Sequence, residues 1–415
     1  MIFENLNIIA PITQALKQKG YNEPTPIQEK VIPHFLNGSD VFGTAQTGTG
    51  KTAAFAIPIL QNLSLSNSDS RSGGIRALIL APTRELAIQI SDSFSDYGKG
   101  LKLRHTVIYG GVSQNPQTTL LRKGIDILIA TPGRLIDLMN QGFIKLDKIE
   151  FFILDEADRM LDMGFAPDIK RIIAKLPARR QTGFFTATIP PEIRALAASL
   201  LHKPIMITTV TVSAPAEGIN QLVYYVEKEG KKALLQQVLL SDEIETVLIF
   251  TRTKHGANRV AQDLNKVGIV AEAIHGNKSQ QARQRALNGF KNRTIKVLVA
   301  TDIASRGIDV EKLSHVINYE LPEVPETYIH RIGRTARAGL KGTAISFCSS
   351  AERGSLKDIN KLLPVSIEVK RMFGYSTIES EQPKAATAER PRHFRAPQHG
   401  NPAGKTKRSF YRNRY

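Results

Sequence analysis

Two segments carry residue types that suit the hydrolysis of a nucleotide. Residues 45–52 read Ala-Gln-Thr-Gly-Thr-Gly-Lys-Thr, and residues 151–158 read Phe-Phe-Ile-Leu-Asp-Glu-Ala-Asp. The first has the composition of a loop that binds phosphate, and the second ends in carboxylates that suit a metal ion and a water molecule. Their order along the chain predicts a nucleotide-hydrolysing enzyme.

The glycine-rich segment has the features of a phosphate-binding loop before a helix. Gly48 and Gly50 allow a turn in which several N–H groups point at one anion, and the helix expected over 52–60 adds its positive end. Lys51 is expected to reach the outer phosphates and Thr52 to ligate Mg²⁺. The alternative is a plain turn between core elements. The full predicted loop is Ala45, Gln46, Thr47, Gly48, Thr49, Gly50, Lys51 and Thr52.

The acidic segment follows a short apolar run. Residues 151–154 are expected to form a buried parallel strand, and such strands present chemistry at their carboxyl ends. Asp155 is expected to hold Mg²⁺ through water, and Glu156 to orient or deprotonate the attacking water. The alternative is that these acids only cap a helix.

Net charge and composition limit the classes of binding partner and the cellular compartment that we expect. The chain has 415 residues and a net charge of +18, which predicts a polyanionic partner, with nucleic acid first and an anionic membrane second. No apolar stretch approaches the roughly 18 residues that span a bilayer, and the first ten residues do not read as a signal peptide, so we expect a cytoplasmic protein. The one cysteine, Cys348, is expected to be a core thiol.

Strand-like runs alternate with helical stretches in both halves of the chain, which predicts two parallel α/β sheets. The joint between them is expected near 208–217, where helix periodicity is lost. The expected strands are 77–80, 106–109, 125–129, 151–154 and 181–185 in the first half, and 222–226, 247–250, 270–274, 297–300, 315–317 and 343–347 in the second.

A third region begins near Thr377. Residues 391–415 contain basic residues and no Asp or Glu, with Phe394, Phe410 and two tyrosines among them. This composition predicts a disordered tail that contacts nucleic acid through charge and base stacking. The alternative is a tail that only improves solubility.

Further short motifs lie before, between and after these two segments. Together, in their order along the chain, they make residues 1 to about 370 resemble the core of a DEAD-box RNA helicase. Ala45, where the general phosphate-loop pattern has Gly, is usual in that family. The short amino terminus, the Thr-Ala-Arg of the last motif and the basic tail resemble the bacterial RhlE subgroup. The motifs are 20–21 with 24–28, 82–86, 110–111, 131–134, 186–188, 250–252, 280 with 283, 300–309 and 330–337.

The resemblance implies two tandem RecA-like parallel α/β domains and a disordered basic carboxyl-terminal tail. The implied boundaries are 1–210 for the ATP-binding domain, with a Q motif in 1–29, then 217–376 for the second domain and 377–415 for the tail.

The resemblance also implies roles around the nucleotide. Gln28 pairs with the adenine edge and selects ATP over GTP, while the aromatic residues Phe3 and Tyr21 belong to the same base site. Asp309 binds the ribose of ATP, and Gly307 is a further ATP-binding residue.

Arg334 and Arg337 are three residues apart, so a helical turn places them on one face. The resemblance makes them the groups that stabilise charge on the γ-phosphate, whereas a surface basic helix is the alternative. The coupling of hydrolysis to strand separation is implied for Asp158, Thr186, Thr188 and His330. Thr186 stands where the family usually has Ser, which keeps the hydroxyl and adds a methyl.

The remaining motifs imply contacts to sugar and phosphate, which read no base sequence. These RNA-binding candidates are Pro82, Thr83, Arg84, Gly110, Gly111, Thr131, Pro132, Gly133, Arg134, Arg252, Gln280, Arg283 and Thr301.

The expected function is ATP-dependent unwinding of short RNA duplexes or remodelling of RNA–protein complexes, with ATP and Mg²⁺ as cofactors. The expected partners are single-stranded RNA or short duplexes, ribosomal precursors or the RNA-decay machinery, with no membrane and a monomeric state. The alternatives are an ATP-gated RNA clamp and an annealing chaperone with little unwinding.

Overall fold

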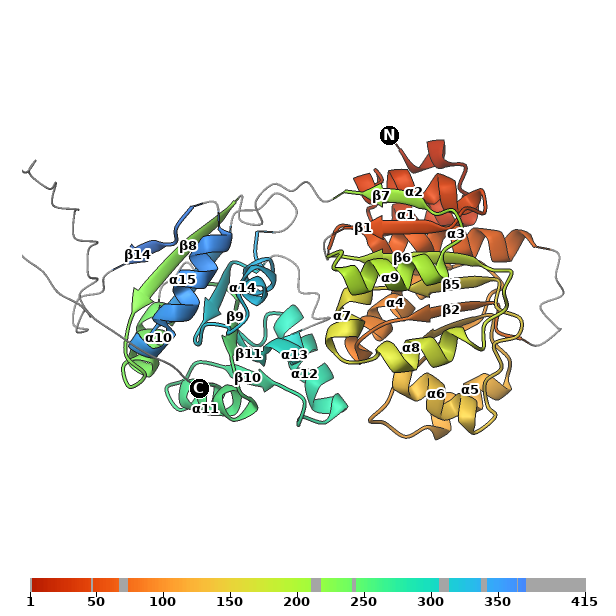
Figure 1. The fold of residues 1–415 in the computed structure, drawn as a ribbon. Helices are drawn as coiled ribbons and strands as arrows, with labels where there is room; N and C mark the ends of the chain where they lie inside the picture. Colours follow the sequence, from red (N-terminus) through yellow and green to blue (C-terminus); the bar gives the residue numbers. More distant parts are fainter. Residues whose placement is uncertain are drawn as a thin grey trace, which may run out of the picture. The chain divides into compact units, whose positions relative to one another are not determined.

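A computed structural model describes most of the chain (Figure 1). The described residues are 2–45, 48–66, 74–209, 218–240, 244–305, 313–336, 342–363 and 365–370. Some of the expectations above lie outside these ranges, namely those for Gln46, Thr47, Gly307, Asp309, Arg337, the joint residues 210–217 and the tail 377–415.

The first sheet has seven strands, and every neighbouring pair in it is parallel. Its order is β3-β4-β2-β5-β6-β1-β7. The strands are β1 (Val41–Thr44), β2 (Ala77–Leu80), β3 (His105–Ile108), β4 (Ile127–Ala130), β5 (Phe151–Leu154), β6 (Gln181–Thr186) and β7 (Ile205–Thr208).

Helices cover both faces of this sheet, because its central strands are apolar on both sides. In β2, Ala77 and Ile79 pack on one face with α2, α3 and α4, while Leu78 and Leu80 pack on the other with α6 to α9. The helical elements are η1 (Phe3–Leu6), α1 (Ala10–Gln18), α2 (Pro26–Leu36), α3 (Lys51–Leu65), α4 (Arg84–Tyr97), α5 (Asn115–Arg122), α6 (Pro132–Asn140), α7 (Ala157–Asp162), α8 (Ala166–Ile173) and α9 (Pro191–Leu200).

The second sheet also has seven parallel strands, in the order β10-β11-β9-β12-β13-β8-β14. The strands are β8 (Ile219–Tyr225), β9 (Val247–Thr251), β10 (Ala271–Ile274), β11 (Val297–Thr301), β12 (His315–Asn318), β13 (Gly342–Cys348) and β14 (Glu368–Lys370). The helical elements are α10 (Lys231–Leu239), α11 (Lys254–Asn265), α12 (Gln280–Lys291), α13 (Asp302–Ser305), α14 (Pro325–Ile332), η3 (Ser350–Glu352) and α15 (Arg353–Leu362).

The predicted fold class is confirmed, because two all-parallel sheets follow one another along the chain. The expected strand 151–154 matches β5 residue for residue. The edge strands β7 and β14 were not anticipated, since β14 is exposed throughout and β7 buries only Ile207 fully. No helix in the described part of the chain is both long and apolar enough to cross a membrane.

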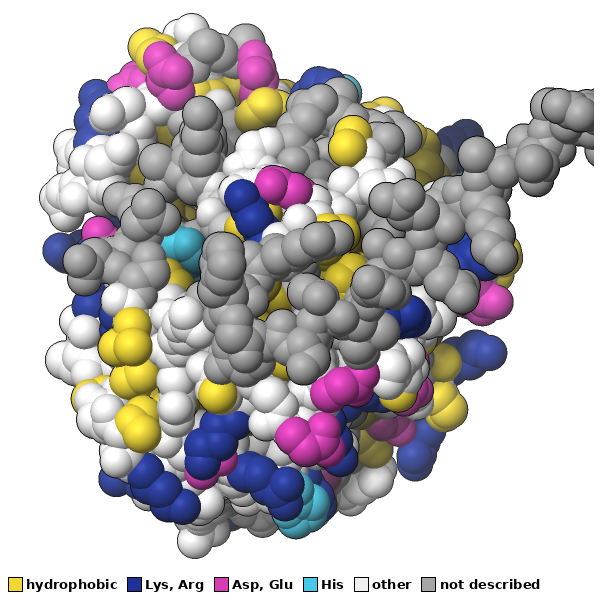
Figure 2. Space-filling model, turned by 90° about the vertical axis from the view of Figure 1, so that its left-hand side faces the viewer, with side chains coloured by type: hydrophobic (Ala, Val, Ile, Leu, Met, Phe, Trp, Pro, Cys, Tyr) yellow, Lys and Arg dark blue, Asp and Glu magenta, His cyan; other side chains and the backbone are white. Residues whose placement is uncertain are grey.

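Basic and acidic side chains are interspersed over the described part of the face shown in Figure 2. Several dark blue Lys and Arg side chains gather along the lower edge of this view, and acidic side chains lie near them, in a chain whose net charge is +18.

Candidate active site and RNA-facing motifs

The glycine-rich loop leaves the carboxyl end of β1 and leads into α3. Gly48 and Gly50 have φ angles of 85° and 91°, in the left-handed region that glycine adopts without strain. Lys51 begins α3, and its side chain is buried, with Nζ donating to the carbonyl of Ala45 at 2.9 Å. The cationic group is therefore held inside the loop, where the outer phosphates of a nucleotide are expected.

Gln28 supports this loop directly. Its Nε2 donates to the carbonyl of Gly50 at 3.1 Å, and its Oε1 accepts from the backbone N–H of Thr25 at 2.9 Å. A Cβ at Gly50 would lie 2.3 Å from Gln28 Nε2, so any larger residue would displace Gln28 as well as strain the backbone at a φ of 91°. Gln28 was expected to contact adenine, and its link to the phosphate loop was missed because no local pattern joins residues 28 and 50.

The two aromatic residues assigned to the base lie in different surroundings. Phe3 is buried among the apolar side chains that α2, α3 and α4 pack against one face of the first sheet. Tyr21 is 40% exposed, and its ring centroid lies 6.2 Å from that of Tyr97. Contact of either ring with a nucleotide stays a prediction.

Asp155 lies just past the end of β5 and is 2% exposed. Its Oδ1 has no hydrogen-bond partner in the described parts of the chain. Burial raises the pKa of Asp155 to about 7, against the charge of Lys51, which lowers it. A buried carboxylate oxygen without a donor is suited to a hydrated cation.

Asp155 and the phosphate-binding loop are suited to a magnesium ion that binds together with nucleotide phosphates. Within the described ranges, no three His, Cys, Asp or Glu side chains gather into a metal cage. Mg²⁺ usually takes one or two protein oxygens together with water and substrate phosphates. Asp155 and Thr52, which follows Lys51 in α3, match that need.

Glu156 has backbone angles of φ 55° and ψ 51°, which non-glycine residues rarely adopt. Such strain persists where the surroundings impose it and is common at functional sites. Its side chain is buried and forms an ion pair with Arg159, one turn along α7. The geometry directs the carboxylate by backbone conformation as well as by charge. Arg159 was not singled out from the sequence.

Asp158 joins the acidic motif to the segment that follows β6. Its Oδ2 accepts from the backbone N–H groups of Ala187 and Thr188, at 3.2 and 2.9 Å, and from Thr188 Oγ1 at 3.0 Å. The buried hydroxyl of Thr186 donates to the carbonyl of Thr188 at 2.8 Å. The three residues assigned to coupling in the first domain therefore form one network.

The motifs assigned to RNA in the first domain follow β2, β3 and β4. The guanidinium of Arg84 packs against Gly111, where an added Cβ would lie 2.3 Å from its Nη1. Arg134 Nη2 donates to the carbonyl of Val112 at 3.1 Å. Its Nη1 is buried and has no hydrogen-bond partner among the residues that the structure describes. Two arginines thus lie beyond the carboxyl ends of these strands, Arg84 against Gly111 and Arg134 held by Val112, where a phosphate could bind.

The other candidates of the first domain begin the same helices. Thr83 caps α4, its hydroxyl accepting from the N–H of Leu86 at 3.3 Å. Thr131 precedes α6, which starts at Pro132 and Gly133. Helix starts present N–H groups that suit phosphate oxygens.

The candidates of the second domain also follow its strands. Thr301 ends β11, Arg252 follows β9, and Gln280 and Arg283 lie in the first turn of α12, which Ser279 caps. Arg283 Nη2 donates to the carbonyl of Ala304 at 3.4 Å.

Arg331 belongs to the last motif, residues 330–337. If this motif were only a basic surface helix, Arg331 would be exposed, but it is buried. It is 1% exposed and forms a two-point ion pair with Asp302. Its guanidinium also lies 5.0 Å from the ring centroid of Phe250. Neither Arg331 nor Asp302 has a role that a local sequence pattern indicates, because their pairing joins residues that are 29 positions apart.

Arg334 is buried just past the end of α14, while His330 is exposed in its last turn. The next residue, Thr335, donates from its hydroxyl to the carbonyl of Leu313 at 2.5 Å. Ala336 has a φ of 54°, another left-handed non-glycine residue. The backbone beside Arg334 is therefore held by tertiary contacts.

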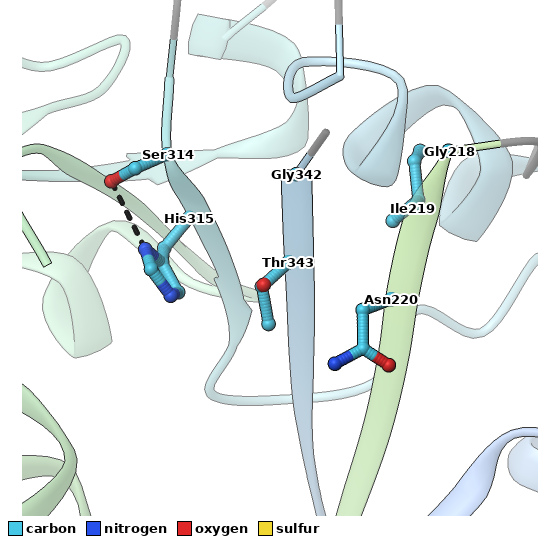
Figure 3. Close-up of a pocket in the computed structure, with 7 residues that line it drawn as sticks. All are labelled: Gly218, Ile219, Asn220, Ser314, His315, Gly342 and Thr343. Atoms are coloured by element: carbon cyan, nitrogen blue, oxygen red, sulfur yellow. Dashed lines mark hydrogen bonds between the residues drawn. The ribbon is translucent and has the colours of Figure 1, made fainter. Parts of the chain in front are cut away.

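A cavity of about 530 Å³ lies at the amino ends of β8, β12 and β13 (Figure 3). In it, Ser314 Oγ lies 3.0 Å from His315 Nδ1. None of the predicted site residues lines it. The lining residues are Gly218, Ile219, Asn220, Ser314, His315, Gly342 and Thr343.

Comparison with known families agrees with the fold and the motifs. Residues 25–196 match the model for "DEAD/DEAH box helicase", and residues 230–339 match "Helicase conserved C-terminal domain". A DEAD-box ATP-dependent RNA helicase, CshA of Geobacillus kaustophilus, is 42% identical over 361 residues, which cover 86% of this chain and 76% of CshA. The chain belongs to the DEAD-box helicase family.

Other relatives extend this comparison. An ATP-dependent RNA helicase of Mycobacterium tuberculosis, DeaD, is 43% identical over 360 residues, 86% of this chain, and this chain spans 63% of the length of DeaD. The structure of Saccharomyces cerevisiae Dbp5 bound to RNA and ADP BeF3 matches with a TM-score of 0.79 at 31% identity, covering 89% of this chain and 95% of Dbp5. A DEAD box protein of Methanococcus jannaschii is 40% identical, with a TM-score of 0.52 and coverage of 89% and 99%.

Proposed function

We propose that this protein is an ATP-dependent RNA helicase. In this proposal RNA stimulates ATP hydrolysis, which separates short duplexes or remodels RNA–protein complexes. The observation that carries the proposal is the buried Asp155, whose Oδ1 lacks a hydrogen-bond partner among the described residues, beside a loop that holds Lys51. Membership of the DEAD-box family supports it.

ATP would bind to the first domain. Lys51 and the glycine-rich loop would hold its phosphates, Gln28 its adenine, and Thr52 and Asp155 the magnesium ion, with water between Asp155 and the metal. Bound Mg²⁺ supplies positive charge against the phosphate oxygens. Glu156 would orient the attacking water and accept its proton.

Hydrolysis would need both domains. Arg334 and Arg337 belong to the second domain and would stabilise the charge that develops on the γ-phosphate. Asp309 would bind the ribose of ATP, and Gly307 would be a further ATP-binding residue. RNA that binds both domains would favour their approach and would thereby stimulate hydrolysis.

RNA would be held by its sugar and phosphate groups, with little preference for sequence. The positions of Arg84 beside Gly111 and of Arg134, which bonds to Val112, support this proposal in the first domain. The similar Dbp5 structure contains RNA, which supports the same class of ligand here.

Finer assignments belong to the same proposal. The Thr335-Ala336-Arg337 sequence and the basic composition of 391–415 support an RhlE-like subgroup. Ribosomal precursors or the RNA-decay machinery are the proposed cellular partners. We propose a monomer that acts in the cytoplasm.

The decisive test compares two variants of the first domain. Glu156→Gln keeps the size of the side chain but removes the charge that could accept a proton, so it should bind ATP and RNA and lose about 10²-fold or more of the turnover rate. Lys51→Ala should instead weaken ATP binding. Normal ATP turnover in Glu156→Gln would refute the assignment of the hydrolytic centre.

A second assay separates unwinding from clamping and annealing. Duplex separation is measured with ATP, with a non-hydrolysable analogue and without nucleotide. A helicase acts with ATP, a clamp only holds RNA with the analogue, and an annealing chaperone needs neither. Deletion of 391–415 should lower RNA affinity and its dependence on salt.

A further inference from the structure

The buried carboxylate of Glu352 lies at the carboxyl edge of the second sheet, beside one of the RNA-binding candidates. Glu352 ends η3 and is 3% exposed. Strands β9, β12 and β13 are neighbours in this sheet, so the residues that follow them meet at this edge.

Five donors converge on the Glu352 carboxylate. Its Oε2 accepts from Lys231 Nζ at 2.5 Å and from the N–H and hydroxyl of Ser349 at 3.0 and 2.7 Å. Its Oε1 accepts from the N–H of Leu321 at 3.0 Å and from Arg252 Nη2 at 3.1 Å. With both oxygens engaged, this carboxylate has a fixed position and orientation.

Lys231 completes the cluster from the start of α10. It is also 3% exposed, and besides Glu352 its Nζ donates to the carbonyls of Tyr319 and Phe347, at 2.8 and 3.3 Å. All three ammonium protons are therefore used. Burial alone would raise the pKa of Glu352, but hydrogen bonds from Lys231 and Ser349 hold it below its ordinary value.

Arg252 is the member of this cluster that reaches solvent, with a side chain 38% exposed. One branch of its guanidinium contacts Glu352, and the other, Nη1, lies 3.6 Å from Glu323, whose side chain is 80% exposed. The backbone N–H of Arg252 also donates to Glu320 at 2.8 Å. The two acidic partners therefore differ, because Glu352 is buried and fixed while Glu323 is exposed and hydrated.

We propose that Glu352 is a positioning residue that holds Arg252 in the orientation that binds the RNA backbone. A phosphate would replace the exposed Glu323 on the outer branch of the guanidinium, and the inner branch would stay on Glu352. This inference rests on the proposed function, since it takes Arg252 to contact RNA.

If Glu352 positions Arg252, removing the Glu352 charge should change RNA affinity in the direction opposite to that expected from charge repulsion. Removing a negative charge near the RNA should strengthen binding if only long-range electrostatics matter. If Glu352 orients Arg252, then Glu352→Gln should weaken binding. The exposed neighbour offers a matched control, because Glu323→Gln removes the same charge without touching the anchor.

The experiment measures binding of a fluorescein-labelled oligouridylate to the full chain with a non-hydrolysable ATP analogue. Glu352→Gln and Arg252→Ala should each raise the dissociation constant by about tenfold, as expected for the loss of one charge-assisted hydrogen bond. Glu323→Gln should leave it unchanged or lower it. ATP affinity without RNA should not change in any variant, since the loop that binds it lies in the first domain.

A double-mutant cycle shows whether Glu352 acts through Arg252. In the Arg252→Ala background, Glu352→Gln should have no further effect on RNA affinity. Additive effects, or tighter binding by Glu352→Gln, would overturn the inference. So would a loss in Glu323→Gln equal to that in Glu352→Gln.

Arg252→Lys provides a test if Glu352→Gln does not fold. It keeps the charge but loses the planar fork that contacts Glu352, so it should weaken RNA binding nearly as much as Arg252→Ala. Unchanged affinity would contradict the inference. A wild-type chain that does not bind the oligouridylate would instead refute the proposed function.

Discussion

Arg331 and Asp302 form a two-point ion pair inside the second domain. Arg331 Nε lies 2.6 Å from Asp302 Oδ1, and Nη2 lies 2.8 Å from Oδ2. The remaining Nη1 donates to Asn318 Oδ1 at 3.1 Å and to the carbonyl of Glu320 at 2.6 Å. The pair joins α14 to the segment after β11, so it holds together the two stretches that carry Arg334 and Thr301.

Arg331→Met should destabilise the protein strongly. It leaves Asp302 without its partner; breaking a fully buried ion pair costs about 3–5 kcal/mol, and because the Asp302 side chain is 29% exposed the loss should lie at or below the lower end of that range. Arg293→Met is the matched control, because the Arg293–Glu245 pair is exposed and should contribute less than about 1 kcal/mol. Urea unfolding of the full chain measures both. Equal losses in the two variants would contradict the structural role of Arg331.

Asp158→Asn should separate ATP hydrolysis from duplex separation. The change removes the charge that accepts three hydrogen bonds from Ala187 and Thr188. RNA-stimulated ATPase should stay within a few-fold of wild type, while unwinding falls by about tenfold, the effect of losing a charge-assisted hydrogen bond. The control is Thr186→Ser, which keeps the hydroxyl and should unwind normally. A parallel loss of both activities in Asp158→Asn would argue against a coupling role.

Gly50→Ala should impair ATP binding. The added Cβ would lie 2.3 Å from Gln28 Nε2, and the φ of 91° is unfavourable for alanine. The strain of about 1–3 kcal/mol predicts at least a several-fold rise in the dissociation constant of a fluorescent ATP analogue. Gly354→Ala, where a Cβ meets open space, should bind as wild type does. Normal affinity in Gly50→Ala would show that the loop relaxes without cost.

Cys348 should be unreactive in the folded protein. Its thiol is buried, and burial raises its pKa to about 12, with the charge of Glu352 acting in the same direction. Because a raised pKa favours the neutral thiol, only about 10⁻⁴ of it is ionised at pH 8, and the thiolate is the reactive form. Alkylation by iodoacetamide should rise with pH throughout the range from 8 to 10 and should become fast on unfolding in urea. Equal rates at pH 8 for folded and unfolded chains would contradict the burial of Cys348.

Much of the fold follows from local patterns that need no tertiary information. The run 151–154 is apolar, four residues long and followed by acids, and it forms β5 as expected. The edge strand β7 is short and only partly buried, because it is held by backbone pairing with β1 on one side while some of its side chains, such as Met206, meet solvent.

The residues of the candidate sites also fall into two groups, those that the sequence indicated and those that only the structure revealed. Residue types and their order along the chain were enough to indicate Lys51, Thr52, Asp155 and Glu156. Few sequences place a group for phosphate, groups for magnesium and a group for water in this succession. No residue type pointed to the buried states of Arg331 and Lys231. A basic residue in a chain of net charge +18 is more often exposed, and burial becomes visible only when its carboxylate partner is located.

The amino-acid sequence by itself determined the class of fold, the family motifs and the order in which the functional segments occur. Only the tertiary structure decided which of these segments share side chains. Gln28 contacts Gly50, and Glu352 contacts Arg252 across 100 residues of sequence. The physical reason is that packing makes residues far apart in the chain neighbours: α2 packs beside α3, which brings Gln28 to Gly50, and parallel strands bring their carboxyl ends to one edge, which brings Glu352 to Arg252.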